Sequence, residues 1–397
     1  MSFRRNTGRR FDSVLLLVVI LLVVLGLIMI YSATFQLVDN DPGYYLKRQM
    51  LWGVLGFALL LVTSQLDYRL WRQFALPIMA LSSLSLVAVL LVGHRGSSAQ
   101  SWLGAGSIQP SEFAKLAFIV YISAWLASKG DKVRDVTYGL IPFGILLGTV
   151  TGLILLQPDL GTALLIVATA VAMFFISGAE PLQLLIGFIV AAPTLYLVII
   201  RSEHAMERLL VFLRPNTDPQ GAGYQVRGIL SGLLAGGLTG RGLGAGTQKL
   251  IPPYLYHTDT ILSVIGEEMG LLGCLVVIGL FVFLAYRGLV ISFRGPDTFA
   301  TLLAFGISCW ILFQAIIHIG GNTANLPFTG ITLPFVSYGG SSLTMCLAGV
   351  GVLLSISREA VERKLTPSAS FAFGRRHRRP RLSGARRSTR TEKRRSR

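Results

Sequence analysis

Cysteine and histidine are scarce in this sequence of 397 residues, which contains three Cys and five His. Cys274, Cys309 and Cys346 each lie inside an apolar run without the spacing of metal ligands, so we expect them to pack in the core. The histidines form no pair at the helical spacing that a metal site requires. These absences argue against disulfides and a zinc centre, and no serine-hydrolase or zinc-peptidase arrangement is evident.

Charge is scarce as well, since 14% of the residues are charged, whereas 52% are hydrophobic and the mean hydropathy is +0.63. A soluble domain of this length carries more charge, so a lipid bilayer is the expected solvent. Lys and Arg outnumber acidic residues 36 to 19, but twelve of the basic residues lie between Arg375 and Arg397, after the last apolar segment. A basic tail in that place is typical of a topology signal or a lipid-headgroup anchor, and we expect no nucleic-acid partner.

Ten apolar windows have about the length that crosses the roughly 30 Å hydrocarbon core of a bilayer. The second window is short, and the first is long for a cleaved signal, so we interpret the first as a retained span. The predicted fold class is an all-α polytopic membrane protein of about ten transmembrane helices. The windows are Val14–Tyr31, Met50–Ser64, Leu76–Val92, Glu112–Ser128, Tyr138–Leu156, Gly161–Ser177, Leu182–Ile200, Ile261–Tyr286, Phe299–Ile319 and Leu343–Ile356.

The basic residues of the short connections predict the orientation, because cytoplasmic loops are enriched in Lys and Arg. With the N-terminus inside, eleven of them lie on the cytoplasmic side and three on the outer side. We expect a multi-pass protein of the cytoplasmic (inner) membrane, with a cytoplasmic N-terminus at 1–12, a membrane domain at 13–357 and a basic, disordered cytoplasmic tail at 358–397. The connection at about 201–260, between the seventh and eighth spans, is then extracytoplasmic and long enough to be functional.

Four polar clusters interrupt the apolar pattern, and this topology places all of them at the outer ends of helices. They are Gln109–Glu112, Gln157–Thr162, His257–Asp259 and Phe335–Ser342. Ionisable residues are costly at membrane depth and usually functional there. Their convergence therefore indicates a site near the outer leaflet.

Several charged residues near these clusters have two interpretations that the sequence leaves open. Glu112 and Lys115 are three residues apart on one helix face, so they form a structural ion pair or place Lys115 to hold a pyrophosphate. Asp159 and Asp259 each precede an apolar helix, where a carboxylate suits an N-cap as well as a functional role. Glu267 and the adjacent Glu268 point roughly 100° apart, so we expect at least one to meet another helix through hydrogen bonds.

The long connection is rich in glycine at a four-residue period, which runs from Gly228 to Gly244. That period predicts a helix with a smooth face, suited to a re-entrant or membrane-surface segment. A nucleotide-binding loop is not expected, because no Gly-Lys-Ser/Thr ending follows the glycines.

Further motifs accompany these clusters along the chain. They are Tyr31-Ser32-Ala33, Phe113-Ala114-Lys115, Gly223-Tyr224-Gln225, Gln248-Lys249, Gly266-Glu267-Glu268 and Leu333-Pro334. Together, and in this order, the motifs resemble those of the FtsW/RodA (SEDS) family of bacterial cell-wall glycan polymerases, from about Val14 to Arg358. The sequence departs from the family pattern at Ser101, at Leu255-Tyr256, at Thr260 and at His318, where asparagine is common.

The resemblance implies polymerisation of lipid II, in which the 4-hydroxyl of one disaccharide attacks the anomeric carbon of another and expels undecaprenyl pyrophosphate with inversion. It makes Asp259 the candidate catalytic carboxylate. Asp259 is also the candidate ligand of a divalent cation, Mg²⁺ or Mn²⁺, that would stabilise the leaving pyrophosphate. The candidate substrate-binding residues are Glu112, Lys115, Asp159, Lys249, His257, Ser337 and Ser341.

The Gly-Glu-Glu and Gln-Lys motifs and the basic tail resemble the division branch, FtsW, more than the elongation branch, RodA. This implies septal cell-wall synthesis beside a class B penicillin-binding protein (a transpeptidase) and other divisome proteins, with lipid II and membrane lipids as ligands. The alternatives are an elongation-type polymerase, a lipid II flippase and a non-catalytic scaffold for a partner synthase. A flippase predicts polar residues through the full depth of the membrane, whereas here they gather at the outer ends, which favours the enzyme.

Overall fold

The computed structural model describes residues 11–35, 41–92, 109–214, 222–247 and 257–365, in which all regular structure is helical. A 3-10 helix, η1 (Gly130–Arg134), and a π-helical turn, η2 (Val136–Leu140), join the fifth α-helix to the sixth. The α-helices are α1 (Ser13–Thr34), α2 (Tyr44–Gln65), α3 (Tyr68–Gln73), α4 (Ala75–Val92), α5 (Pro110–Lys129), α6 (Ile141–Leu155), α7 (Leu160–Ile176), α8 (Pro181–Arg201), α9 (Glu203–Leu213), α10 (Ala222–Ala235), α11 (Ile261–Phe293), α12 (Thr298–Asn322) and α13 (Gly340–Leu365).

Eight helical segments of the described chain are long and apolar enough to cross a membrane. Two shorter apolar helices, Ala75–Leu91 and Leu160–Ile176, complete a set that matches the ten predicted windows. The prediction of a short second span was wrong, because α2 has 22 residues and begins at Tyr44. Its first turns carry polar side chains, which a search for apolar windows leaves out. α11 is the longest helix described, with 33 residues, and it is kinked at Gly270, whose φ is 69°.

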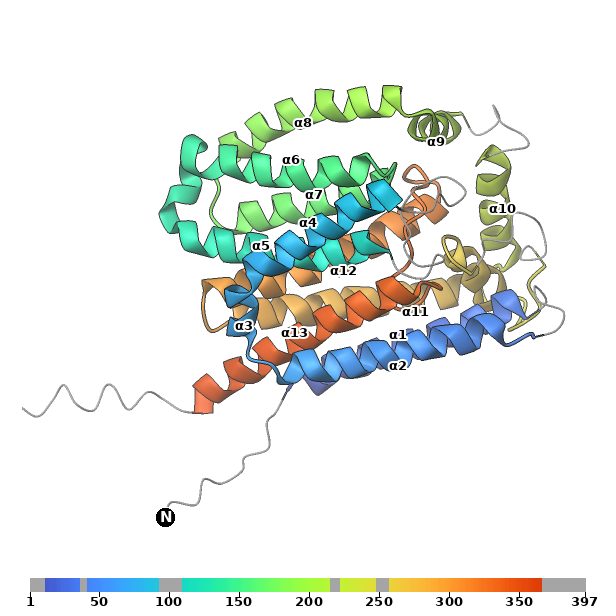
Figure 1. The fold of residues 1–397 in the computed structure, drawn as a ribbon. Helices are drawn as coiled ribbons and strands as arrows, with labels where there is room; N and C mark the ends of the chain where they lie inside the picture. Colours follow the sequence, from blue (N-terminus) through green and yellow to red (C-terminus); the bar gives the residue numbers. More distant parts are fainter. Residues whose placement is uncertain (1–10, 36–40, 93–108, 215–221, 248–256, 366–397) are drawn as a thin grey trace, which may run out of the picture.

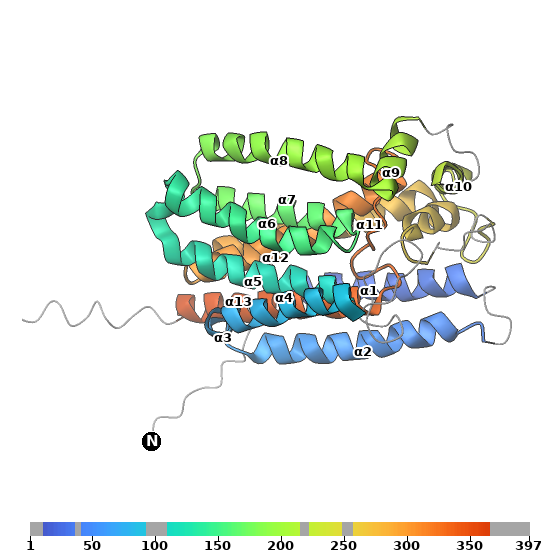
Figure 2. The ribbon, with the colours of Figure 1, turned by 45° about the horizontal axis from the view of Figure 1, so that its top comes forward.

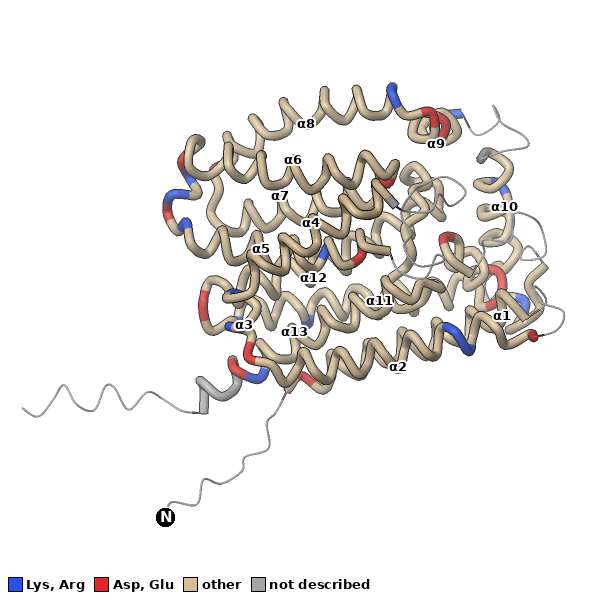
Figure 3. Tube along the Cα trace, viewed as in Figure 1, with Lys and Arg blue, Asp and Glu red and all other residues tan. Residues whose placement is uncertain are grey.

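The long helices run side by side in one bundle. Figures 1 and 2 show the start of α1 and the end of α13 at the same end of this bundle, and α9 and α10 at the opposite end. Charged residues lie mostly near the two ends, whereas the middles of the helices carry few of them (Figure 3). This distribution is typical of a chain that crosses a membrane repeatedly.

α12 lies inside the bundle, where it packs against α5, α7 and α11 (Figure 1). α2 packs along α13 at glycine positions that allow the two backbones to approach closely. A Cβ on Gly56 would lie 2.6 Å from Cδ1 of Leu347, and a Cβ on Gly351 would lie 2.5 Å from the carbonyl oxygen of Leu60. Small residues at helix contacts are a common source of packing in membranes, where the hydrophobic effect does not drive helices together.

The connection at about 201–260 contains two helices, α9 and α10, of which α9 was not predicted. The helical prediction for its glycines is correct for Gly228 and Gly232 in α10 and wrong beyond Ala235. Residues 236–247 form turns instead, with positive φ at Gly237, Gly240, Gly242 and Gly244. We call residues 236–247 the glycine segment. It packs so closely on α11 that a Cβ on Gly240 would lie 2.2 Å from the carbonyl oxygen of Glu268.

Candidate active site

Asp259 lies in the turn 257–260, directly before α11. The N-cap of α11 is Thr260, without a side-chain capping bond, so the interpretation of Asp259 as a helix cap was wrong. The Asp259 carboxylate instead faces Gly330: a Cβ built there would lie 3.5 Å from Oδ2 of Asp259 and 3.7 Å from Nη2 of Arg208. Arg208, on α9, also donates from Nη1 to the carbonyl oxygen of Thr329 at 2.9 Å. A carboxylate and a guanidinium therefore face the same point of the chain.

The environment of Asp259 changes its acidity. The pKa of Asp259 is raised from 3.8 to about 7, chiefly by burial; Arg208 and a hydrogen bond with Thr258 oppose the rise, and the charge of Asp159 adds to it. A proton acceptor is most effective when its pKa lies near the working pH. Asp259 is therefore matched to general-base chemistry at neutral pH.

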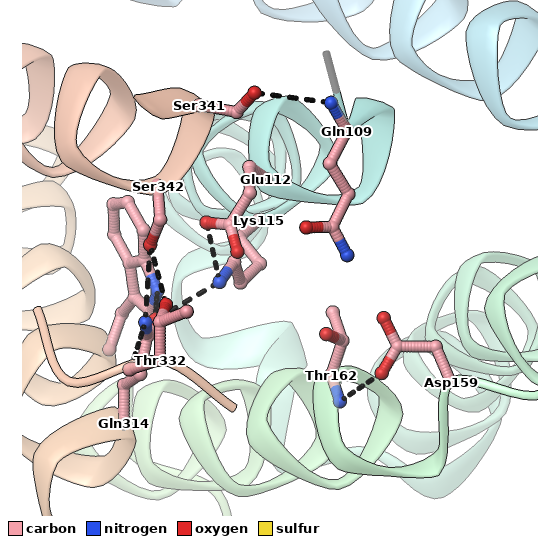
Figure 4. Close-up of polar contacts among 10 residues, drawn as sticks. Gln109, Glu112, Lys115, Asp159, Thr162, Gln314, Thr332, Ser341 and Ser342 are labelled. Atoms are coloured by element: carbon pink, nitrogen blue, oxygen red, sulfur yellow. Dashed lines mark hydrogen bonds and ion pairs between the residues drawn. The ribbon is translucent and has the colours of Figure 1, made fainter. Parts of the chain in front are cut away.

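Asp159 begins α7 as its N-cap, where Oδ1 accepts a hydrogen bond from the backbone N–H of Thr162 at 3.0 Å (Figure 4). The capping interpretation of Asp159 is thus confirmed. Its charge also acts on Asp259, so the fold brings together two carboxylates that are 100 positions apart in sequence. One oxygen of Asp159 serves as the cap, and the predicted role of this residue in substrate binding stays a prediction.

Glu112 and Lys115 form an ion pair near the start of α5, with Nζ of Lys115 at 2.7 Å from Oε2 of Glu112 (Figure 4). The side chains are 7% and 1% exposed, respectively. Nζ of Lys115 also donates to Oε1 of Gln314 at 3.0 Å and lies 5.6 Å from the ring centroid of Trp310. This geometry fits the structural ion pair that the sequence left open. The alternative, that Lys115 holds a pyrophosphate, stays a prediction.

His257, Ser337 and Ser341 lie in segments that the fold joins together. The ring of buried His257 contacts the rings of Tyr45 and Tyr338, with centroids 4.6 Å and 5.4 Å away. The N–H of Tyr338 donates to the carbonyl oxygen of His257 at 2.8 Å, which ties the turn before α11 to the segment before α13.

The two serine hydroxyls take part in local structure. Oγ of Ser337 accepts from the N–H of Leu333 at 2.9 Å, and Oγ of Ser341 accepts from the N–H of Gln109 at 3.1 Å (Figure 4). Their proposed contacts with substrate are untested. Lys249, the remaining candidate, lies outside the described residues.

Glu267 and Glu268 hold the glycine segment against α11. Oε1 of Glu267 accepts from the N–H of Thr247 at 2.8 Å and pairs with Arg241 at 3.2 Å. Oε2 of Glu268 accepts from the N–H of Gly244 at 3.0 Å and from the hydroxyl of Ser32 on α1. The expectation that one of the two glutamates meets another helix is confirmed by this bond to α1.

Among the described residues, no group of three or more His, Cys, Asp or Glu side chains gathers in a way that could hold a metal ion. Asp259 and Asp159 are hard oxygen donors of the type that Mg²⁺ and Mn²⁺ prefer, and Mg²⁺ is often bound by one or two carboxylates together with substrate phosphates. The donor set therefore fits a cation that arrives with a pyrophosphate substrate better than a cation held by the protein alone.

The sequence analysis missed three residues that the fold brings to this region: Arg208, Gln314 and Asn322. Arg208 was one of several basic residues in a presumed loop, and nothing local distinguished it. Gln314 was visible as a polar residue inside the window Phe299–Ile319, and Asn322 follows eight positions later, just beyond that window, at a helical spacing.

Similarity to known proteins connects this geometry with a family. A family model described as Cell cycle protein (FTSW_RODA_SPOVE) matches residues 12–362. The chain belongs to the FtsW/RodA/SpoVE family. It is 39% identical, over 354 residues, to a probable peptidoglycan glycosyltransferase FtsW from Trichlorobacter lovleyi, and the match covers 87% of this chain and 93% of that protein.

Two solved structures share the fold of this FtsW/RodA/SpoVE member. One is a chain from a peptidoglycan synthase complex that coordinates polymerisation and crosslinking; it is 31% identical, has a TM-score of 0.76, and the match covers 88% of this chain and 98% of that one. The other is the rod shape determining protein RodA of Thermus thermophilus, 29% identical with a TM-score of 0.66, and here the match covers 88% of this chain and 97% of that one. The resemblance inferred from the motifs is thus confirmed.

Proposed function

We propose that this family member is a peptidoglycan glycosyltransferase that joins lipid II disaccharides, with Asp259 as the group that accepts the proton of the attacking 4-hydroxyl. The single observation that carries the role of Asp259 is its placement. The carboxylate is not used as a helix cap, it faces Arg208, and burial brings its pKa to about 7. These are the properties of a general base rather than of a structural carboxylate.

In the proposed reaction, the oxygen of the 4-hydroxyl forms a bond with the anomeric carbon of the second disaccharide. The bond from that carbon to undecaprenyl pyrophosphate breaks, and the hydroxyl proton passes to Asp259. Arg208 places a positive charge near the carboxylate, where it can attract the pyrophosphate as negative charge develops on it. A divalent cation, Mg²⁺ or Mn²⁺, would neutralise the same charge when bound, and Asp259 is the residue that would hold it.

We also propose that the chain acts in division, at the septum, with a class B penicillin-binding protein and other divisome proteins as partners. Its identity to the FtsW relative, 39%, exceeds its identity to RodA of Thermus thermophilus, 29%. The related chain in a peptidoglycan synthase complex supports a partner that crosslinks the strands. The proposed location is the cytoplasmic membrane, with both termini in the cytoplasm.

The test is lipid II polymerisation by purified protein, with and without a cognate class B penicillin-binding protein. Asp259→Asn removes the negative charge at nearly constant size, and we expect it to lower the rate about 10²–10⁴-fold. Asp131→Asn, at an exposed position of η1 at the other end of the bundle, is the matched control and should polymerise like wild type. Glycan strands from Asp259→Asn within a few-fold of wild type would rule out the role of Asp259. Transfer of labelled lipid II across vesicles without any strands would point to a flippase.

A further inference from the structure

Three buried polar residues repeat along one face of α12. Gln314, His318 and Asn322 are four positions apart, so they lie one above another on the helix. Their exposed fractions are 0%, 2% and 1%. Polar side chains inside a membrane protein are costly unless they form hydrogen bonds, so each requires a partner.

Each residue of this series, which we call the α12 ladder, binds a different part of the site. Oε1 of Gln314 accepts from Nζ of Lys115 at 3.0 Å and from Nε1 of Trp310 at 2.9 Å, while its Nε2 donates to the carbonyl oxygen of Thr332 at 3.0 Å (Figure 4). Nδ1 of His318 lies 2.7 Å from the carbonyl oxygen of Ile331. A carbonyl can only accept, so Nδ1 carries the proton and donates it.

The last member of the ladder reaches the candidate base. Nδ2 of Asn322 donates to the carbonyl oxygen of Asp259 at 3.0 Å and to that of His318, one turn back, at 2.9 Å. The ladder thus starts at the Glu112–Lys115 ion pair and ends at the backbone of Asp259.

Residues 329–332 form a segment without regular secondary structure. Side chains donate hydrogen bonds to three of its four backbone carbonyl groups. Arg208 binds Thr329, His318 binds Ile331 and Gln314 binds Thr332. Gly330, within this segment, is the residue that the Asp259 carboxylate and the Arg208 guanidinium both face. α12 supplies two of these three side chains and α9 supplies the third, so both helices set the position of that segment relative to Asp259.

We infer that the α12 ladder is a positioning device for the transfer reaction: Gln314, His318 and Asn322 fix residues 329–332 and the Asp259 backbone in one geometry. A displacement of about 1 Å in a catalytic group can reduce a rate about 10²-fold. The inference rests on the proposed role of Asp259. It adds that the alignment of Asp259 depends on hydrogen bonds from a helix that supplies no reacting group.

His318 allows a sharp test, because asparagine can place an amide N–H close to the position of Nδ1, whereas leucine cannot donate. We expect His318→Leu to lower kcat for lipid II polymerisation about 10- to 100-fold with KM within about twofold of wild type. His318→Asn should restore kcat to within about threefold of wild type. Ser308→Ala is the matched control: Ser308 is buried on the same helix, but its hydroxyl bonds only within the helix, to the carbonyl oxygen of Ala304 at 2.7 Å.

Melting temperature in detergent is measured for every variant, so that loss of fold is separated from loss of alignment. A His318→Leu protein that melts earlier but keeps kcat within twofold of wild type would overturn the inference, as would a fall in kcat for Ser308→Ala of the same size. If His318→Leu does not accumulate, Asn322→Leu, which has a similar size and cannot donate to Asp259, is assayed in its place with the same expectation. Activity of Asp259→Asn within a few-fold of wild type would refute the proposed role of Asp259, on which the inference rests, whereas an inactive Asp259→Asn beside a fully active His318→Leu would refute only the ladder.

Discussion

At the scale of single residues, the charged side chains named here, which are buried or partly buried, differ in how closely they are partnered. Four charged side chains have close partners among other side chains or backbone amides: Glu112, Lys115, Glu267 and Glu268. These partners compensate for the water that each charge loses on burial. Asp259 has weaker compensation, so its carboxyl holds a proton more tightly than an ordinary aspartate does. The first four are held by partners within the fold, and the raised pKa of Asp259 suits the proton transfer that we propose for it.

The buried Glu112–Lys115 pair leads to a stability prediction. Glu112→Gln or Lys115→Met alone leaves one uncompensated charge inside the bundle, so each should lower the free energy of unfolding by about 3–5 kcal/mol. The double variant should recover most of that loss. Lys47→Met, which breaks the exposed pair with Asp41, is the control and should unfold like wild type. Unfolding in detergent measures all four. A stable Lys115→Met protein with weakened lipid II binding would instead assign Lys115 to substrate.

The raised pKa of Asp259 predicts how activity depends on pH. Below about pH 7 the carboxyl is largely protonated and cannot accept a proton, so the rate should rise about tenfold per pH unit up to that point and then level off. Initial rates of strand formation between pH 5.5 and 8.5 measure this profile. Arg208→Gln removes a charge that lowers this pKa, so the midpoint should move to higher pH. A flat profile for wild type across this range would contradict the assignment.

The same shift has a consequence for stability. The folded chain binds this proton more tightly than the unfolded chain, whose carboxyl has an ordinary pKa of 3.8. The stabilising contribution of the proton is therefore present in full below about pH 4 and is lost as pH rises through about 7. The pH range of highest activity is thus a range in which Asp259 stabilises the fold least.

At the scale of elements, the glycine segment and the kink of α11 form one unit. The N–H groups of Arg241 and Gly242 donate to the carbonyl oxygens of Glu267 and Glu268, each at 3.0 Å. Because α11 bends at Gly270, the carbonyl groups of Glu267 and Glu268 accept hydrogen bonds from the glycine segment. In return, the N–H groups of Leu271 and Leu272 donate to the carbonyl oxygens of Gly237 and Leu238. The two irregular stretches thus supply hydrogen bonds to each other's backbone N–H and C=O groups. Inside a membrane these groups find no water, so irregular backbone there must be hydrogen-bonded within the protein.

Gly270→Ala tests this unit. The new Cβ would lie 2.4 Å from the backbone N of Gly240 at a residue whose φ is 69°, so we expect a loss of about 2–4 kcal/mol in stability and faster proteolysis within residues 236–247. Gly279→Ala, in the same helix with open space around its Cβ, should be neutral or stabilising by up to about 1 kcal/mol. Equal melting temperatures for the two variants would show that the close contact is not made.

At the scale of the whole molecule, the bundle has two different ends. One end carries α9, α10 and the glycine segment, and the other carries η1 and the short turn between α11 and α12 (Figure 1). Asp259, Arg208 and Asp159 are contributed by elements far apart in sequence that meet only because the long helices return to the same end. In the proposed orientation this end faces the outer leaflet, so a substrate anchored there would meet it first.

The orientation can be measured with single cysteines, because Cys274, Cys309 and Cys346 are buried and should react slowly. Lys132→Cys in η1 and Asn325→Cys after α12 are exposed positions at opposite ends of the bundle. We expect a membrane-impermeant maleimide to label Asn325→Cys in intact spheroplasts and Lys132→Cys only after permeabilisation. The wild-type protein supplies the background, and the reverse pattern would place the termini outside.

The sequence by itself determined the number of spans, the ends at which polar residues gather, the family and the candidacy of Asp259. These properties depend on apolar runs and short motifs, which are local in the chain. Only the tertiary structure decided that Asp259 caps no helix, that Arg208 faces it, that the glycine segment leaves the helical form, and that Glu268 binds Ser32, 236 positions away. These features depend on which residues are buried and which distant residues they meet. Both are decided when the chain folds, so short motifs and apolar runs do not reveal them.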